Sequence, residues 1–322
     1  MRSLLLLLAF LLPAMAAEYP EANISNGILK AKLHLPDPQK GYYQATRFDW
    51  SGQMPSLEYK GHTYFGQWNP APYTPKLHDA IMGPVEEFLT DGTGLGYGEA
   101  KAGGTFIKIG VGVIRKPDEP KFQQFKTYDI VDNGKWTVKK RADSVEFTQT
   151  VADPSLGYAY QYTKVVRLLK GKPMMVLEHR FKNTGKKPIE SDVYEHNFYM
   201  LDKTPTGPDI VVKFPFEVHN AQDLKGFAET RGKELVYLKE LTGRESAQSN
   251  LTGYSSDPKD YDIVVENRKT GVGVRQTGDR PIVRINYWSI RSTPCPEPYI
   301  HVKAAPGETF TWKISYEFYA PK

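Results

Sequence analysis

The chain has 322 residues, a formal net charge of +5, an aromatic content of 12% and one cysteine. A single cysteine excludes an internal disulfide, so Cys295 is buried, free or paired with another chain, and we expect burial. The basic residues are scattered rather than gathered in a stripe, which argues against a nucleic-acid-binding protein.

The N-terminus has the pattern of a secretory signal peptide. Arg2 precedes an unbroken apolar block over residues 4–12, and an Ala-x-Ala site follows. The block is too short to span a bilayer as a helix, and no later apolar run is long enough. We therefore expect a signal peptide over residues 1–16, cleaved after Ala16 or Ala17. The rest, residues 17–322, should be a single domain without a membrane span, exported to the periplasm or the cell exterior.

Before residue 145 the chain shows few regular segments. Residues 29–35 alternate apolar and polar side chains with the period of a half-buried strand, and strands are predicted to resume over residues 105–114. Residues 58–75 are rich in aromatic side chains and broken by prolines, which predicts a loop with little regular structure. The glycines of residues 92–98 lack the spacing of a phosphate-binding loop, so we interpret this segment as a flexible surface loop.

From residue 145 onward, short alternating segments separated by turns indicate many strands. We expect them within residues 145–151, 160–169, 175–182, 209–214, 235–238, 262–265, 272–275, 283–290 and 310–318. Only residues 221–230 look weakly helical. This pattern, without a repeat or a linker, predicts an all-β sandwich or barrel. The aromatic content suits β-structure, and it also suits sugar binding, because flat rings pack against the C–H faces of pyranoses.

Histidines and carboxylates are the candidates for chemistry. The seven histidines lack the spacing of a zinc site, so no metal is expected, and a Gly-x-Ser-x-Gly turn is absent. His179 shares a strand face with apolar side chains and is interpreted as structural. His196 follows a tight polar turn, and Glu297 lies between two prolines that hold its backbone. A histidine and a carboxylate brought together across a concave sheet can move two protons on one small molecule. Either residue could equally be structural.

Several segments resemble the aldose 1-epimerase (galactose mutarotase-like) family. Residues 195–201 read Glu-His-Asn-Phe-Tyr-Met-Leu and follow the turn at residues 183–188, which is similar to the family's Asn-His-x-Tyr-Phe-Asn-Leu motif. Trp288 and the later Cys295-Pro-Glu297-Pro-Tyr299 resemble a tryptophan and a Cys-x-Glu-Pro-Trp pattern of one branch. Residues 305–310 resemble the family's final turn. The similarity covers roughly residues 175–320 and implies a large antiparallel β-sandwich, the galactose mutarotase-like supersandwich.

The resemblance implies a carbohydrate-active isomerase that interconverts the anomers of a free aldose without a cofactor. His196 would be the general acid at the ring oxygen, and Glu297 the general base at the anomeric hydroxyl. Glu297 would be anionic and His196 cationic, because each charge favours the other. Arg47 and His78 are the nearest equivalents of the family's sugar-holding arginine and histidine, and Trp288 and Tyr299 would also contact the sugar.

Departures from the family pattern leave other functions open. Glu195 stands where the motif has asparagine, and Tyr299 where it has tryptophan. The first alternative is a non-catalytic exported carbohydrate-binding protein of the same fold, and the second is an enzyme acting on an oligosaccharide. The expected partner is in each case a sugar or a glycan. Asn23 and Asn250 match the N-glycosylation acceptor pattern.

Overall fold

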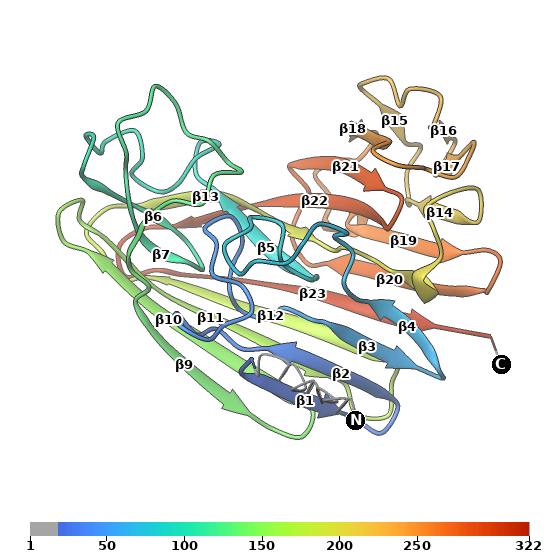
Figure 1. Ribbon diagram of the computed structural model, residues 1–322, viewed down its shortest axis with the longest axis horizontal. Helices are drawn as coiled ribbons and strands as arrows, with labels where there is room; N and C mark the ends of the chain where they lie inside the picture. Colours follow the sequence, from blue (N-terminus) through green and yellow to red (C-terminus); the bar gives the residue numbers. More distant parts are fainter. Residues whose placement is uncertain (1–18, 322) are drawn as a thin grey trace, which may run out of the picture.

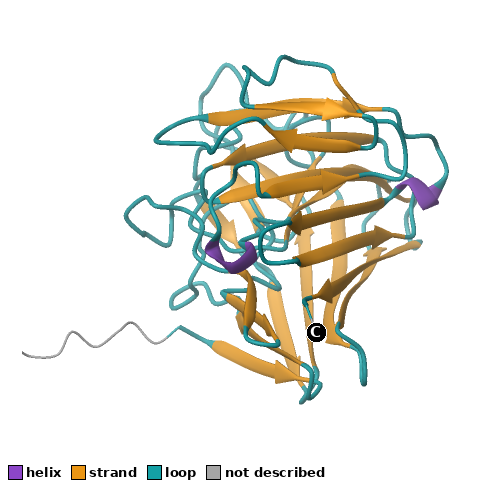
Figure 2. Cartoon of the chain, turned by 90° about the vertical axis from the view of Figure 1, so that its right-hand side faces the viewer, coloured by secondary structure: helices purple, strands orange, loops and turns teal. Residues whose placement is uncertain are grey.

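The structure is a computed structural model that describes residues 19–321. These residues form 23 β-strands and two short 3-10 helices, η1 (Leu201–Lys203) and η2 (Pro258–Asp260). The predicted all-β class is therefore confirmed (Figure 2). No helix in this part of the chain has the length and apolar character needed to cross a membrane. The predicted signal peptide, residues 1–16, and the first residues of the predicted domain lie outside the described residues.

The largest sheet has ten strands in the order β16-β17-β14-β19-β20-β23-β12-β11-β10-β9, and its neighbours are antiparallel. Its strands are β9 (Lys135–Lys140), β10 (Ser144–Asp153), β11 (Tyr158–Leu168), β12 (Met174–Asn183), β14 (Ile210–Lys213), β16 (Ala228–Arg231), β17 (Glu234–Tyr237), β19 (Asp262–Asn267), β20 (Val272–Gly278) and β23 (Thr309–Tyr319).

Three smaller sheets complete the fold. The six-stranded sheet has the order β15-β18-β21-β22-β13-β5. Its strands are β5 (Val85–Leu89), β13 (Ile189–His196), β15 (His219–Asn220), β18 (Ser246–Thr252), β21 (Arg284–Ile290) and β22 (Thr293–Ala304). The four-stranded sheet comprises β1 (Glu21–Ser25), β2 (Leu29–His34), β3 (Ser56–Tyr59) and β4 (His62–Phe65). The three-stranded sheet comprises β6 (Thr105–Lys108), β7 (Gly112–Arg115) and β8 (Ile130–Asp132).

One face of the ten-stranded sheet carries both the six-stranded and the four-stranded sheet (Figure 1). On β23 the even-numbered residues from Trp312 to Phe318 are buried, whereas Thr311, Lys313 and Glu317 are exposed. Phe318 packs against Tyr64 of β4, with ring centroids 4.8 Å apart, and Trp312 approaches Phe88 of β5 at 6.3 Å. Residues of equal parity share a strand face, so both smaller sheets lie against the same side.

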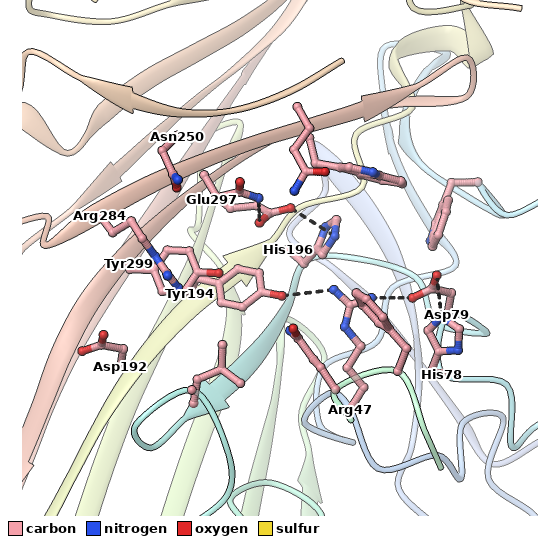
Figure 3. A pocket seen from close by; sticks show the side chains of 18 residues that line it. Arg47, His78, Asp79, Asp192, Tyr194, His196, Asn250, Arg284, Glu297 and Tyr299 are labelled. Atoms are coloured by element: carbon pink, nitrogen blue, oxygen red, sulfur yellow. Dashed lines mark hydrogen bonds and ion pairs between the residues drawn. The ribbon is translucent and has the colours of Figure 1, made fainter. Parts of the chain in front are cut away.

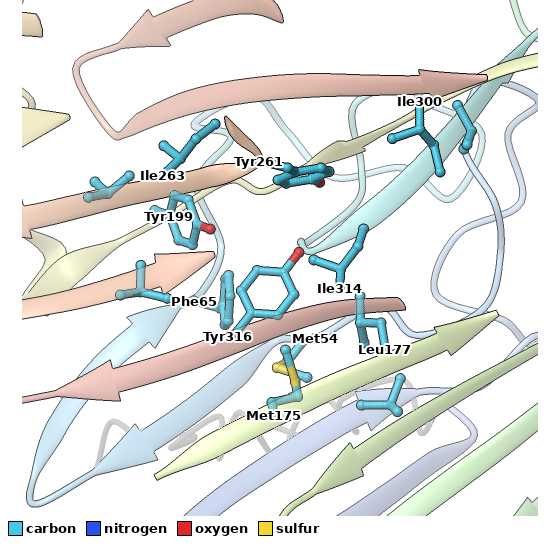
Figure 4. Packing of buried hydrophobic residues seen from close by; sticks show 14 of the residues in the cluster. Met54, Phe65, Met175, Leu177, Tyr199, Tyr261, Ile263, Ile300, Ile314 and Tyr316 are labelled. Carbon is cyan, nitrogen blue, oxygen red and sulfur yellow. The ribbon is translucent and has the colours of Figure 1, made fainter. Parts of the chain in front are cut away.

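A contiguous cluster of buried apolar side chains joins these three sheets. It extends from Ala22 on β1 to Phe318 on β23, and Figure 4 shows Met54, Met175 and Ile314 within it. Each buried Leu, Ile, Met or Phe side chain contributes about 1.5–3 kcal/mol of transfer free energy. Cys295 is buried, as expected, in a second cluster beside the cavity described below.

The strand predictions after residue 145 are confirmed, since each of the nine segments contains a strand. One earlier prediction is wrong in part. Residues 58–65 belong to the hairpin β3–β4, because Lys60 and Gly61 adopt φ angles of +50° and +81° and close the two-residue turn that such hairpins favour. Residues 105–114, where strands were predicted to resume, form the hairpin β6–β7, which turns at Gly110 with φ +82°.

The weak helix predicted over residues 221–230 is also wrong. Lys225 and Gly226 both have left-handed φ angles, +59° and +67°, which a right-handed helix does not accept. The chain then enters β16, which pairs with β17. Residues 92–98 form a loop as predicted, but Leu95 and Tyr97 within it are buried.

Candidate functional site

A cavity of about 590 Å³ opens on one face of the six-stranded sheet. It is lined by residues of β5, β13, β18, β21 and β22, of the segment between β2 and β3, and of the loops that connect β4 to β5 and β7 to β8. All six residues predicted from the sequence to form the site line this cavity (Figure 3). They are Arg47, His78, His196, Trp288, Glu297 and Tyr299.

Strand alternation explains why several of these side chains share one face. Glu297 and Tyr299 are two residues apart on β22, so they point to the same side of the sheet. The register pairs Glu297 with Asn286 of β21 and pairs Tyr299 with Arg284 of the same strand. On its other side Tyr299 is paired with Tyr194 of β13. The five side chains therefore form one continuous surface.

The strand that carries Glu297 contains prolines at positions 294, 296 and 298, which hid it from sequence prediction. Alternate residues of an antiparallel strand direct their N–H groups to opposite neighbours, and a proline has no N–H to direct. The prolines therefore occupy positions that face away from β21. On that side β13 joins β22 only from Tyr299 onward, so no ladder hydrogen bond from the prolines is required.

His196 is the last residue of β13, and aromatic rings fix the orientation of its imidazole. Phe198 lies flat against it, with ring centroids 3.7 Å apart and planes 10° apart. Phe48 and Trp288 meet it edge-on at 5.6 and 5.5 Å. Phe198 has a left-handed φ of +47°, so the chain turns back sharply after the strand. On its other face Phe198 stacks on Trp68 at 4.3 Å.

The side chain of Asn197 anchors this turn to the two large sheets. Its amide Nδ2 donates to Gln276 Oε1 at 3.0 Å and to the carbonyl oxygen of Pro296 at 3.1 Å. Its Oδ1 accepts from the hydroxyl of Tyr316 at 2.9 Å. Asn197 is fully buried, so these bonds hold His196 against β22.

His196 and Glu297 are in direct contact at the centre of the cavity. The Nε2 atom of His196 lies 3.2 Å from Oε1 of Glu297. The other carboxyl oxygen, Oε2, accepts a hydrogen bond from Asn286 Nδ2 at 2.7 Å. The geometry thus places a positioned acid–base pair beside a cavity wide enough for a small molecule (Figure 3).

The expected charges of this pair are wrong in this structure. Burial raises the pKa of Glu297 to about 8, and burial together with the positive charge of Arg47 lowers the pKa of His196 well below its ordinary value. At neutral pH these pKa values favour a protonated, neutral Glu297 beside a neutral His196. Mutual attraction does not offset the removal of both groups from water.

Arg47 is held by acidic and phenolic groups rather than left open to the cavity. Its Nε donates to Glu87 Oε2 at 2.9 Å, and its Nη1 donates to Asp79 Oδ1 at 2.6 Å. Its Nη2 donates to the Tyr194 hydroxyl at 3.3 Å. His78 Nε2 lies 3.1 Å from the second oxygen of Asp79. Burial favours a higher pKa for Asp79, but its bonds with His78 and Arg47 outweigh burial and lower the pKa.

The aromatic part of the site contains Trp288 and Tyr299, which were predicted from the sequence, and Tyr194, which was not. Tyr299 stacks on Tyr194 at 4.3 Å, and the guanidinium of Arg284 lies over the Tyr299 ring at 3.8 Å. The missed residues Asn286 and Arg284 share a strand face with Trp288, and Tyr194 shares one with His196. Alternation within the predicted strand over residues 283–290 would therefore have found Asn286 and Arg284, but Tyr194 lies on β13, which was not predicted as a strand.

The two asparagines that match the N-glycosylation acceptor pattern differ in their surroundings. Asn23 is exposed on β1, whereas Asn250 lies on β18 and lines the cavity. A glycan attached to Asn250 would occupy the cavity, so glycosylation at this residue and ligand binding by the cavity exclude each other.

Behind the site, between the sheets, lies a cluster of buried charged side chains. Glu86 of β5 forms ion pairs with Lys164 of β11 and with His179 of β12. An oxygen of Glu195 on β13 lies 3.9 Å from His179 Nε2. None of the four is more than 3% exposed. His179, interpreted from the sequence as structural, is thus buried as expected, but it contacts carboxylates as well as apolar side chains.

The charges within this cluster are balanced by its own members. Burial favours a higher pKa for Glu86, but Lys164 and His179 outweigh it and lower the pKa to about 2. Burial and the neighbouring charge of Glu86 raise the pKa of Glu195 well above its ordinary value. Glu86, His179 and Glu195 bring potential metal-ligand atoms within 4.8 Å of one another. The four residues form an ionic network in which the ammonium of Lys164 supplies the positive charge beside Glu86, and both carboxyl oxygens of Glu195 lack a hydrogen-bond partner within residues 19–321.

Comparison with known proteins gives structural similarity only. No known family model matches the sequence, and no curated protein matches it significantly. A galactose mutarotase related enzyme from Lactobacillus acidophilus aligns with a TM-score of 0.58 at 12% identity, over 93% of this chain and 97% of that chain. A galactose mutarotase-like protein from Lactobacillus casei aligns with a TM-score of 0.56 at 13% identity, over 93% and 100%. An aldose epimerase homologue from C. elegans aligns with a TM-score of 0.54 at 12% identity, over 95% and 100%. At these identities the likeness establishes the fold.

Proposed function

We propose that this chain, which has the galactose mutarotase-like fold, interconverts the anomers of a free aldose by acid–base ring opening in the cavity. The observation that carries the proposal is the 3.2 Å contact between His196 Nε2 and Glu297 Oε1 beside a cavity of about 590 Å³. Two of the similar solved structures are described as a galactose mutarotase related enzyme and an aldose epimerase homologue, which supports the reaction class.

The adjacency of the two groups suits the chemistry of a cyclic sugar. The ring oxygen and the anomeric hydroxyl are bonded to the same carbon, so an acid and a base that touch each other can serve both. A proton first passes from Glu297 to His196. The imidazolium then protonates the ring oxygen while the carboxylate takes the proton of the anomeric hydroxyl. The carbon–oxygen bond of the ring breaks, and a carbonyl forms at the anomeric carbon.

Ring closure completes the cycle with no net change in protons. Opening leaves His196 neutral and Glu297 protonated, which is the protonation state that the lowered pKa of His196 and the raised pKa of Glu297 favour. Rotation about the bond between the first two sugar carbons presents the other face of the carbonyl. The same two groups then run the transfers in reverse and give the other anomer. Each step is a proton transfer, so the proposal invokes no cofactor.

The surrounding residues orient the sugar and the base. Asn286 holds the second oxygen of Glu297, which directs the first toward the cavity. Trp288 offers a flat ring on which the C–H face of a pyranose packs, whereas the two faces of the Tyr299 ring are covered by Tyr194 and Arg284. Arg47 and His78 act through Asp79, which both of them bind, and this set forms the opposite wall.

The proposal is tested by following anomer exchange of several aldoses by exchange NMR or polarimetry. The native protein should accelerate exchange of at least one sugar, and Glu297→Gln and His196→Asn should each reduce kcat by roughly 10²–10⁴-fold. His219→Asn, exposed and outside the cavity, is the matched control. Rates unchanged by both site variants would refute the roles. Saturable sugar binding without accelerated exchange would make the protein a carbohydrate-binding protein instead.

Export is a second part of the proposal. Its support is the leader pattern over residues 1–16. Expression of the full chain in a secreting host should give a mature protein that begins at residue 17 or 18 by mass spectrometry. A full-length product retained in the cell would contradict it.

A further inference from the structure

Among residues 19–321, one cation that lines the cavity has no carboxylate partner. Arg47 is paired with Asp79 and Glu87, and His196 lies against Glu297. Arg284 also lines the cavity, but within residues 19–321 no carboxylate lies within ion-pair distance of its guanidinium. Its contact is the face of Tyr299, 3.8 Å from the guanidinium carbon.

Stacking on Tyr299 prepares Arg284 for a planar or branched anion. The phenol ring fixes the plane of the guanidinium and gains from its charge, but it uses none of its N–H groups. These N–H groups form a rigid fork that matches the paired oxygens of a carboxylate or a phosphate. The side chain is exposed to the cavity, so an anion could reach it without unfolding any part of the wall.

Neutral hydrogen-bond donors lie at the same end of the cavity. Asn250 and Gln248 of β18 both line it, and no hydrogen bond within the described chain engages either side-chain amide. Figure 3 shows Arg284 and Asn250 on one side of Glu297, with Arg47 and Asp79 on the other. The carboxylate at the Arg284 end, Asp192, has its own partner in His301, with Nδ1 2.8 Å from Oδ1.

The spacing along the sheet matches the length of one sugar ring. Arg284 and Asn286 are two residues apart on β21, a separation of about 7 Å along the strand. Asn286 binds Glu297, so Arg284 lies about one ring away from the acid–base pair. A sugar with its anomeric carbon at His196 and Glu297 therefore places its far end beside Arg284.

We propose that the cavity takes a monosaccharide that carries an anionic group, a carboxylate or a phosphate, at the end remote from the anomeric carbon, and that Arg284 binds this anion. This inference deepens the proposed function and rests on it for the orientation of the sugar. The binding of the anion itself does not depend on catalysis, so the two can fail separately.

The experiment compares glucose, glucuronate and glucose 6-phosphate with the native protein and two variants. Binding is measured by calorimetry, and anomer exchange by NMR. Arg284→Gln removes the charge and Arg284→Lys keeps it without the fork. Arg180→Gln, which changes an exposed arginine on the opposite face of the ten-stranded sheet, is the matched control. Thermal unfolding of each variant checks the fold.

We expect at least one of the two anions to bind at least tenfold more tightly than glucose. Arg284→Gln should weaken binding of that anion tenfold or more and change the affinity for glucose by less than twofold. Arg284→Lys should weaken binding of the anion less than Arg284→Gln does, and Arg180→Gln should not change it. The tighter of the two anions identifies the group. Anions that bind no better than glucose, or an equal loss for all three sugars in Arg284→Gln, would overturn the inference.

The two hypotheses give different patterns of failure. Binding of an anion that depends on Arg284, without accelerated exchange of any sugar, would leave this inference standing and refute the proposed function. Accelerated exchange of glucose alone, insensitive to Arg284→Gln, would do the reverse.

Discussion

Glu195 and His196 are consecutive on β13 and face opposite sides of the six-stranded sheet. His196 lines the cavity, whereas Glu195 lies in the ionic network between the sheets. The neighbouring strand β5 repeats this arrangement, since Glu87 binds Arg47 at the cavity and Glu86 binds Lys164 in the interior. The site and the buried network are therefore two faces of the same pair of strands.

The pH dependence of catalysis should follow the single proton shared by His196 and Glu297. Above about pH 8 Glu297 loses that proton, which leaves two bases and no acid. Well below the ordinary histidine value of 6.5, His196 gains a second proton, which leaves two acids and no base. The rate should fall on both sides, and kcat measured from pH 4 to 10 checks this. A rate that keeps rising beyond pH 9 would contradict it.

Replacement of Asn286 should separate positioning from chemistry. Its hydrogen bond to Glu297 favours the carboxylate and opposes the raised pKa. Asn286→Ala should lower kcat by roughly 10- to 100-fold through loss of orientation and move the alkaline limb of the pH profile to higher pH. Asn220→Ala, outside the cavity, serves as control. A lower kcat with an unmoved alkaline limb would show that the bond does not tune Glu297.

Stability should depend on pH through Glu297. The folded protein keeps this proton up to about pH 8, whereas the unfolded chain releases it near 4.5. The stabilisation is therefore complete below pH 4.5 and is lost as the pH rises through 8, at about 1.4 kcal/mol per pH unit. Urea unfolding of the native protein and Glu297→Gln at pH 5 and 8 measures this slope. Parallel curves for the two proteins would argue against a raised pKa.

The buried network should be sensitive to loss of one partner. Lys164→Met leaves the carboxylate of Glu86 with only His179 beside it in the interior, and we expect a loss of about 3–5 kcal/mol. Adding Glu86→Gln to Lys164→Met should restore part of the lost stability, because the uncompensated charge of Glu86 is then removed. Lys139→Met, from an exposed pair with Glu146, should cost less than about 1 kcal/mol. Denaturant unfolding measures all three, and equal losses for Lys164→Met and Lys139→Met would be the contrary result.

Much of the fold was predictable because alternate residues of a strand lie on opposite faces of the sheet, so that apolar and polar residues alternate in the sequence. On β23 the predicted inward residues are buried and their neighbours exposed. The hairpin β3–β4 was missed because aromatic residues and prolines around it obscured a two-residue turn at Lys60 and Gly61. β22 was missed as a strand because three prolines break the usual strand composition, although they lie at positions that need no N–H.

The sequence predicted which residues line the site. It did not predict which of them bind each other, or the charges that they carry. Motif order brought His196 and Glu297 together, and both line one cavity. The binding of Arg47 to Asp79, Glu87 and Tyr194 depends on the register of segments that no local pattern specifies. The charges of the pair were wrong because the degree of burial, which sets both pKa values, follows from the whole fold.

The prolines of β22 have a consequence beyond the placement of Glu297. Where β13 ends, no strand within residues 19–321 pairs with this stretch of β22 on that side, and an unpaired sheet edge normally invites pairing with another chain. The prolines at positions 294, 296 and 298 have no N–H to donate to another chain, and the carbonyl oxygen of Pro296 already accepts a hydrogen bond from Asn197. Residues 293–300 are also buried, so this edge is closed to other chains both by its missing N–H groups and by the segments packed over it.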